Sequence, residues 1–371
     1  MTQQDRFEIF MTAPPGLEHA LRDEALACGF SAPKVVTGGV TFQGRWREVW
    51  RANLLMRGAG HVLARLGQFP AKHMAELDKR AREFNWGAVL KHGFPVQVSA
   101  SCTGSKLYHS GAVAQRIAAA IHDARSAPLS DDAEVVIKAR IDHDICTLSV
   151  DTSGELLHKR GAKAAVGKAP MRETMASLML RACGFTGVEP MLDPMCGSGT
   201  FVIEAAEMAL GLAPGRARSF AFEHLATYDA KAWAELKASV PRHEGKFRFF
   251  GSDRDAGAIR MSQANAERAG VAEAVSFSQL PISALQRPDG PAGLVIVNPP
   301  YGARIGEKKP LYALYGALGM TLRERFSGWR VGLVTSDGKL ARATELPFKP
   351  EQPPILHGGL RVRLYQTAPL P

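Results

Sequence analysis

Long apolar runs, paired cysteines and metal-ligand spacings are all missing from this sequence. No stretch approaches the roughly 20 apolar residues that a membrane-spanning helix needs, and the polar N-terminus shows no export signal. The five cysteines lie far apart, are odd in number and include no CxxC pair, which argues against a disulfide framework or a zinc site. These absences predict a soluble, cytoplasmic protein with reduced thiols.

Two kinds of catalytic chemistry are also disfavoured. The 11 histidines show no H-x-x-E-H pattern and no Cys/His ligand spacing, so no metal is expected. Ser198 does not lie in the G-x-S-x-G pattern, the sharp turn that presents the serine nucleophile of a hydrolase. The chemistry must therefore be sought in other residues.

Positive charge, in contrast, is in excess. The chain has 46 Lys and Arg against 36 Asp and Glu, which gives a net charge of +10 and a pI near 9.5. Such a balance favours a polyanionic partner, because phosphate contacts release condensed counterions. Solubility alone is the other explanation for this charge.

At 371 residues the chain is long enough for two or three domains. The first part, about 150 residues, mixes strand-like and helix-like segments, among them a strand at Val35–Phe42. A strand pair, Ala133–Arg140 and Ile145–Asp151, flanks a polar turn. This order predicts one or two α+β modules of small antiparallel sheets with helices on one face.

From Pro170 onward the order becomes helix, strand, helix, strand, which is typical of a parallel α/β sheet. The stretch Leu212–Lys246 is an insertion between the first two strands of this half. Its position predicts that it could line a substrate cleft.

The strongest motif is the segment Asp193–Thr200, with sequence DPMCGSGT, between an apolar strand and the helix expected at Phe201–Leu210. Glycines let the backbone approach a ligand closely, and a helix N-terminus presents free N–H groups. A dinucleotide fingerprint is disfavoured because Asp253, the next acid at a strand end, lies much further along the chain. A purely structural glycine turn is the alternative.

Asp253 follows the second strand of this half, where a carboxylate can accept hydrogen bonds from both hydroxyls of a ribose. It could instead cap the helix expected at Ala256–Ala269, although the neighbouring Asp255 suits that role better.

The third motif, Asn298-Pro299-Pro300-Tyr301, follows the apolar strand Leu294–Val297. The Asn298 side-chain carbonyl and the Pro299 backbone carbonyl can bind the two hydrogens of a base amino group, which localises its lone pair and aims it at a sulfonium methyl group. Tyr301 can stack on a base that has been rotated into the pocket. Without the other two motifs, an Asn-Pro-Pro turn would be only a turn.

Through nearly its whole length the chain resembles the bacterial RlmL family of ribosomal RNA guanine-N2 methyltransferases. The resemblance rests on short segments in both halves: Thr12–Glu18, Gly38–Phe42, Arg51–Leu54, Ser105–His109, Leu157–Gly161, Ala169–Thr174, Asp193–Thr200, Gly251–Asp253 and Asn298–Gly302. It implies a ferredoxin-like part at 1–45, a THUMP RNA-binding domain at 46–154 and a Rossmann-like class I methyltransferase domain at 155–371. The implied cofactor is S-adenosylmethionine, and the implied partner is RNA, either 23S ribosomal RNA or a large-subunit precursor.

The resemblance also implies which residues bind the cofactor. They precede or follow the strands of the second half: Pro170, Asp193, Met195, Cys196, Gly197, Ser198, Gly199, Thr200, Asp253, Arg254 and Leu280. Asp253 would hold the ribose, and Asp193 to Thr200 would surround the methionine part. Relatives often carry an acid after the third strand to bind the adenine amino group, whereas this chain reads Gln279-Leu280-Pro281-Ile282-Ser283 there. Adenine would then be bound by backbone groups or by Ser283.

Two alternatives remain open. Asn-Pro-Pro-Tyr also occurs in adenine-N6 methyltransferases of DNA, but the chain shows no helix-turn-helix or zinc-finger pattern. A non-catalytic RNA-binding or assembly factor is the other alternative, and the intact glycine segment with Asn-Pro-Pro-Tyr argues against it.

Overall fold

The computed structural model describes residues 5–160, 171–245, 248–301, 308–357 and 359–371. Its contacts divide the chain into two units. The first unit comprises Met1–Thr12, Ala25–Leu157 and Arg218–Val240, and the second comprises Ala13–Glu24, His158–Ala217 and Pro241–Pro371. Each unit is built on one seven-stranded sheet. Among the described helices, none is both long and apolar enough to cross a membrane.

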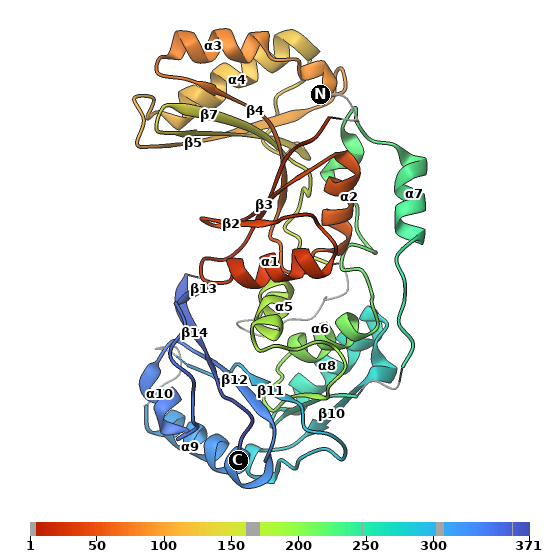
Figure 1. The fold of residues 1–371 in the computed structure, drawn as a ribbon, viewed down its shortest axis with the longest axis vertical. Coiled ribbons are helices and arrows are strands. Elements are labelled where there is room, and N and C mark those ends of the chain that lie inside the picture. Colours follow the sequence, from red (N-terminus) through yellow and green to blue (C-terminus); the bar gives the residue numbers. More distant parts are fainter. Residues whose placement is uncertain (1–4, 161–170, 246–247, 302–307, 358) are drawn as a thin grey trace. The chain divides into compact units, whose positions relative to one another are not determined.

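The first half of the chain alternates strands and helices (Figure 1). In chain order these elements are β1 (Phe7–Thr12), α1 (Glu18–Ala27), β2 (Lys34–Val36), β3 (Gly39–Gly44), α2 (Trp46–Leu55), β4 (Val62–Pro70), α3 (Met74–Glu83), η1 (Trp86–Ala88), β5 (Val96–Thr103), α4 (Ser110–Arg125), β6 (Val135–Asp142) and β7 (Ile145–Asp151).

The first sheet has the strand order β2-β3-β1-β4-β7-β6-β5. Its opening β-α-β-β-α-β sequence of elements is the ferredoxin-like arrangement. The long strand β4 pairs with β1 on one side and with β7 on the other, so the ferredoxin-like part and the following α+β module share a single sheet. The expected α+β class of the first half is confirmed.

Two details of this sheet differ from the prediction. Strands β5 and β6 are parallel, because the helix α4 between them returns the chain to the same edge. The strand expected at Val35–Phe42 is instead a hairpin of β2 and β3, since Gly38 turns the backbone with a φ of +78°.

The insertion between the first two strands of the second half belongs largely to the first unit. Its residues Arg218–Val240 include η2 (Ala221–His224) and α7 (Ala230–Ala238). The Phe222 ring stacks on Trp50 of α2 at 6.0 Å, and the Phe222 N–H donates to the Thr152 carbonyl at 3.1 Å. Trp233 meets the Phe222 ring edge-on at 5.1 Å. Aromatic packing thus attaches this stretch, here called the strap, to the first unit.

The second half of the chain continues with a further set of elements (Figure 1). In chain order they are α5 (Glu173–Ala182), β8 (Met191–Asp193), α6 (Thr200–Ala209), β9 (Phe249–Asp253), α8 (Ala256–Ala269), η3 (Ala272–Ala274), β10 (Val275–Gln279), η4 (Ile282–Ala284), β11 (Leu294–Val297), α9 (Lys308–Arg325), β12 (Arg330–Thr335), α10 (Gly338–Ala343), β13 (Ile355–His357) and β14 (Leu360–Gln366).

The second sheet has the strand order β10-β9-β8-β11-β12-β14-β13. The strands from β10 to β12 are parallel, and β14 is antiparallel to both β12 and β13. The chain leaves β8 toward β9 on one side and returns to β11 on the other, which makes the β8/β11 boundary a topological switch point. The predicted Rossmann-like second half is confirmed, and ligands of such sheets bind at this boundary.

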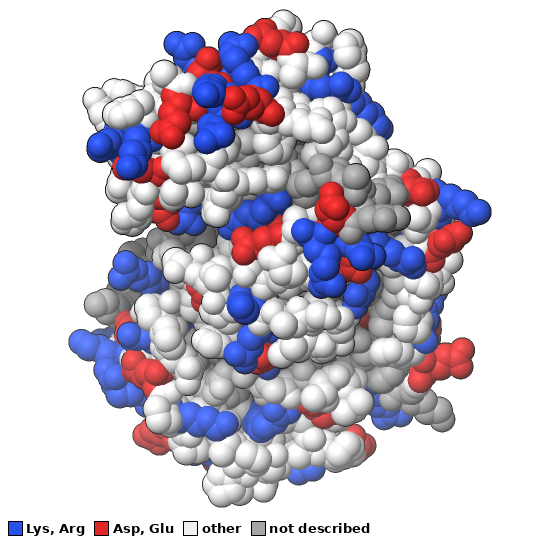
Figure 2. All heavy atoms as spheres, turned by 45° about the horizontal axis from the view of Figure 1, so that its top comes forward, with Lys and Arg blue, Asp and Glu red and all other residues white. Residues whose placement is uncertain are grey.

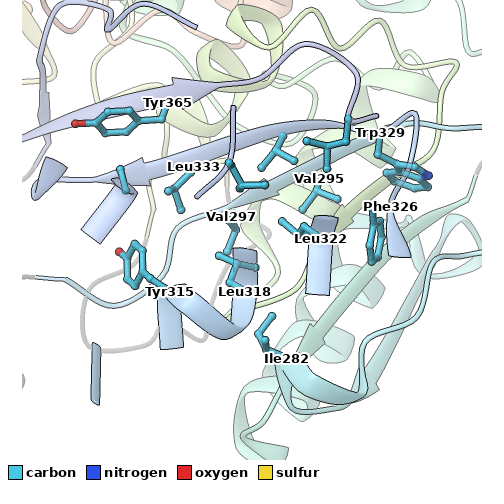
Figure 3. Close-up of a cluster of buried hydrophobic side chains, with 14 of the residues drawn as sticks. Ile282, Val295, Val297, Tyr315, Leu318, Leu322, Phe326, Trp329, Leu333 and Tyr365 are labelled. Atoms are coloured by element: carbon cyan, nitrogen blue, oxygen red, sulfur yellow. The ribbon is translucent and has the colours of Figure 1, made fainter. Parts of the chain in front are cut away.

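A buried core under one face of this sheet supports the switch point. Figure 3 shows Tyr315 and Leu318 of α9 facing Val297 of β11 and Leu333 of β12. All four side chains are fully buried. Their packing fixes the strand that leads into Asn298.

Candidate functional site

The three predicted motifs follow neighbouring strands of the second sheet. The segment 193–200 follows β8, while Asp253 ends β9 on one side of it and Asn298 follows β11 on the other. The register pairs Leu192 with Phe250 of β9 and with Val295 of β11. Because parallel strands end at the same edge, these segments come together at the switch point.

The backbone of the glycine loop, residues 193–200, requires glycine at two positions. Gly197 and Gly199 both have left-handed backbones, with φ values of +54° and +82°. A Cβ atom on Gly199 would also lie 3.1 Å from the Cβ of Ser262 on α8. Gly199 is the N-cap residue of α6, so the loop delivers the free N–H groups of that helix to the sheet edge.

Asp253 holds this loop instead of capping the next helix. Its Oδ2 atom accepts a hydrogen bond from Gly197 N at 3.1 Å, and its Oδ1 atom accepts one from Asp255 N at 3.0 Å. Asp255 is the N-cap residue of α8 and accepts a hydrogen bond from Gly257 N at 2.7 Å, as predicted. Each carboxylate oxygen has two lone pairs, which leaves Asp253 able to accept further hydrogen bonds.

In contrast to Asp253, which is of intermediate exposure, Asp193 is buried. Burial raises the pKa of its carboxyl group to about 8, although a hydrogen bond from Met195 N, at 3.1 Å to Oδ1, lowers the pKa in part. The neighbouring Asp253 carboxylate raises the pKa further. A cationic group of a ligand beside this carboxyl group would lower its pKa again and favour the carboxylate, so that Asp193 could balance that charge once the ligand is bound.

The end of β10 completes this side of the site. Leu280 N donates to the Asp253 carbonyl at 3.0 Å, and the Gln279 side chain donates to the carbonyl of the exposed Arg254 at 3.2 Å. A hollow of about 630 Å³ lies beside Leu280, with Ser278 and Leu285 also in its lining. No acidic side chain occupies positions 279–283.

Asn298 has an unusual environment. Its Oδ1 atom is buried and accepts no hydrogen bond from any described residue. Buried polar atoms are nearly always hydrogen-bonded, and leaving such an atom without a hydrogen bond costs about 1–3 kcal/mol. Such an atom at a ligand-binding edge points to an acceptor that is satisfied by a ligand.

The backbone after Asn298 is held from α9. The Tyr315 hydroxyl lies 3.4 Å from the Pro300 carbonyl and 3.3 Å from Thr335 Oγ1. Burial raises the pKa of Tyr315 to about 12, so the hydroxyl remains a donor. Tyr301 is partly buried against the core below, and that burial raises the pKa of its phenol. The Asn-Pro-Pro-Tyr turn is therefore anchored on two sides.

Most of the predicted site residues are thus brought to one edge of the sheet. Met195, Cys196, Ser198 and Thr200 lie in the glycine loop, where Cys196 N donates to the Ser252 carbonyl at 2.9 Å. Pro170 lies outside the described residues. Within the described ranges, no group of three or more His, Cys, Asp and Glu side chains could hold a metal ion.

Sequence reasoning missed three supporting residues. Ser262 and Asn265 of α8 donate hydrogen bonds to carbonyl groups of the glycine loop, and Tyr315 contacts the Pro300 carbonyl. The available signal for the first two was a pair of polar residues three positions apart on the buried face of an otherwise alanine-rich helix.

Family models match both halves of the chain. Residues 160–354 match the RMKL-like methyltransferase domain (UPF0020), and residues 8–63 match the RlmL ferredoxin-like domain. The Ribosomal RNA large subunit methyltransferase K/L of Vibrio campbellii is 33% identical over 340 residues, which are 88% of this chain and 48% of that protein. The chain therefore spans about half the length of this curated relative.

Solved structures of similar proteins cover the chain almost completely. The structure of SMU.472, a putative methyltransferase complexed with SAH, has a TM-score of 0.89 at 26% identity, and the match covers 99% of each chain. That of a predicted N6-adenine-specific DNA methylase from Listeria monocytogenes has a TM-score of 0.86 at 29% identity, covering 98% of this chain and 96% of that one. With the glycine loop and Asn-Pro-Pro-Tyr at the switch point of the sheet, these matches show that the chain belongs to the RMKL-like methyltransferase family.

Proposed function

We propose that the chain transfers a methyl group from S-adenosylmethionine to an exocyclic amino group of a base in ribosomal RNA, namely guanine N2 of 23S RNA. The observation that carries the proposal is the Asn298 Oδ1 atom, buried and without a partner among the described residues, at the switch point beside the glycine loop. An amino group of a base would satisfy this acceptor.

S-adenosylmethionine is the cofactor, and it supplies the activated methyl group. The residues present fit it, because Asp193 offers a buried carboxyl group and Asp253 keeps lone pairs free for ribose hydroxyls. The residues 193–200 would surround the methionine part, and Arg254 and Leu280 would flank the adenine. The hollow beside Leu280 has room for a planar ring and carries Ser252 and Ser278 as polar groups. The SAH complex of SMU.472 supports this assignment.

The Asn-Pro-Pro-Tyr turn would prepare the nucleophile. A ring amino group is a poor nucleophile because its lone pair is delocalised into the base. Asn298 Oδ1 and the Pro299 carbonyl would accept its two hydrogens and aim the lone pair at the methyl group. Tyr301 would stack on the base and Pro300 would keep the turn in place through Tyr315.

An RNA partner is supported by the net charge of +10 and by the name of the Vibrio campbellii relative. The face in Figure 2 carries Lys and Arg interspersed with Asp and Glu instead of one continuous basic patch, so shape and stacking would have to add to charge in recognition. We assign the ferredoxin-like part to the residues of β1 to β4, beyond the boundary expected at residue 45, a THUMP domain to the residues from there to 154, and the methyltransferase domain to 155–371. A ribosomal RNA substrate places the protein in the cytoplasm.

The test compares Asn298→Ala with Asn298→Asp in single-turnover methyl transfer to ribosomal RNA with saturating donor. We expect the alanine variant to lose about 10²-fold or more, the usual effect of removing a preorganised polar group at a reacting centre. The aspartate variant keeps an acceptor and should retain more activity. Equal rates for wild type and Asn298→Ala would refute the amino-group mechanism.

Mass mapping of the methylated base identifies the product. Methyl on guanine N2 of 23S RNA supports the proposal, whereas methyl on adenine N6, of RNA or of DNA, would replace guanine as the substrate while keeping the same mechanism.

A further inference from the structure

Two side chains of α8 donate hydrogen bonds to backbone carbonyls of the glycine loop. Ser262 Oγ donates to the Gly197 carbonyl at 2.8 Å, and Asn265 Nδ2 donates to the Ser198 carbonyl at 3.0 Å. Ser262 is 0% exposed and Asn265 is 2% exposed, so both donors are shielded from bulk solvent.

These two bonds determine where the loop directs its own donor groups. In a trans peptide the C=O and N–H groups point in opposite directions. Because the Gly197 carbonyl points to Ser262, the N–H of Ser198 in the same peptide must point away from α8. The next peptide is also fixed at both ends, since Asn265 binds the Ser198 carbonyl and Gly199 N donates to the Cys196 carbonyl at 2.8 Å.

Arg268 controls the orientation of the Asn265 amide. One guanidinium nitrogen, Nη2, donates to Asn265 Oδ1. With its oxygen bound to arginine, the amide must present its NH₂ group to the Ser198 carbonyl. A flipped amide would place two oxygens against each other and would leave the guanidinium facing a donor.

Packing alone does not hold the loop at this point. Ser198, Thr200 and Asn265 all line one small pocket. Dispersion contacts carry no direction, so the hydrogen bond from Asn265 is the contact that fixes where the Ser198 carbonyl points.

We infer that Ser262 and Asn265, the latter oriented by Arg268, are positioning residues that hold the glycine loop in its donor-binding conformation. This inference rests on the proposed function, because it takes the loop to be the binding site of the methyl donor. Neither side chain needs to touch the donor. Their effect is to remove loop conformations in which the Ser198 N–H faces α8, and such preorganisation strengthens binding.

The test measures the affinity of the full-length chain for S-adenosylhomocysteine by calorimetry, and KM and kcat with S-adenosylmethionine and ribosomal RNA. Asn265→Asp keeps the size of the side chain but turns an acceptor toward the Ser198 carbonyl. Ser262→Ala removes the other donor and adds no bulk. The matched control is Gln263→Ala, since Gln263 is exposed on the same helix.

We expect Asn265→Asp to weaken S-adenosylhomocysteine binding by about tenfold or more, the equivalent of one lost buried hydrogen bond. KM for the donor should rise similarly, with kcat at saturating donor within about twofold of wild type. Ser262→Ala should act in the same direction, and Gln263→Ala should match wild type. Faster hydrogen exchange at the 197–200 amides, with the strands unchanged, would support the same conclusion.

Two results would overturn the inference. One is unchanged affinity in both Asn265→Asp and Ser262→Ala, and the other is a fall in kcat with unchanged KM for the donor. If Asn265→Asp fails to fold, Ser262→Ala decides the matter alone. A wild-type chain that binds no S-adenosylhomocysteine would overturn the proposed cofactor together with this inference, whereas wild-type binding that both variants match would overturn the inference alone.

Discussion

Replacement of Asp193 by asparagine should flatten the pH dependence of the stability of the donor-free protein. Burial raises the pKa of the Asp193 carboxyl group from its ordinary value of 3.8 to about 8. Between these two values the folded chain keeps a proton that the unfolded chain has released. The contribution of protonated Asp193 to the free energy of unfolding is therefore complete below about pH 4 and is lost as the pH rises toward about 8.

The slope follows from the proton count. A difference of one bound proton between the folded and unfolded states changes the free energy of unfolding by about 1.4 kcal/mol per pH unit. Asparagine cannot ionise, yet its Oδ1 atom can still accept the hydrogen bond from Met195 N. The variant should match wild type near about pH 4 and should be the more stable protein near about pH 8.

Urea denaturation of both proteins without donor, at several values between about pH 5 and pH 8, measures this difference directly. Asp289→Asn is the matched control, because Asp289 is exposed on a loop of the same unit. It should leave the wild-type pH profile unchanged. Parallel profiles for wild type and Asp193→Asn would show that Asp193 is ionised in the folded state across this range and would refute the reasoning.

Two further predictions concern stability. Trp233→Ala should lower the free energy of unfolding by about 3–5 kcal/mol, because Trp233 is almost fully buried against Phe222 in the strap. Thermal unfolding followed by tryptophan fluorescence would check this prediction. A change under about 0.5 kcal/mol, the scale of an ordinary surface substitution, would contradict it. Glu204→Gln should lower the free energy of unfolding by about 3–5 kcal/mol, because the buried Arg160 would lose one of its two charged partners, Glu204 and Glu207 of α6. Chemical denaturation beside Glu267→Gln, an exposed glutamate on α8, gives the comparison, and equal midpoints would contradict the prediction.

Much of the site could be predicted from the sequence because its parts are local. The strand before Asp193, the glycine loop and helix α6 are consecutive, so their pattern is visible in a short window. The same is true of β11 and Asn298. The strand order β9-β8-β11 then brings these segments together by the general rule for parallel sheets.

The supporting contacts could not be predicted, because their partners are distant in the sequence. Ser262 and Asn265 bind carbonyls 65 and 67 residues earlier in the chain, and their polar pattern on α8 does not identify these partners. The parallel pairing of β5 and β6 was missed for a similar reason, since the strands alone do not show on which edge α4 returns the chain.

The sequence identified the strap as part of an insertion but did not identify what it packs on. The aromatic side chains of residues 218–240 pack on the first unit through Phe222 and Trp50. Only the tertiary structure identifies such a partner, because Trp50 lies in the first helix pair of the chain and the strap follows α6.

The strap also sets an order of events during synthesis. Domains usually fold as units from the N-terminus while the chain is still being made. Here the first unit cannot complete its contacts when β7 leaves the ribosome, because residues 218–240 are added only after β8 and α6 of the second unit. Until then the side of Trp50 that packs on Phe222 lacks this partner. The two units must therefore mature together, and a ribosome that stalls between β7 and the strap would release an N-terminal unit with an unfinished aromatic core.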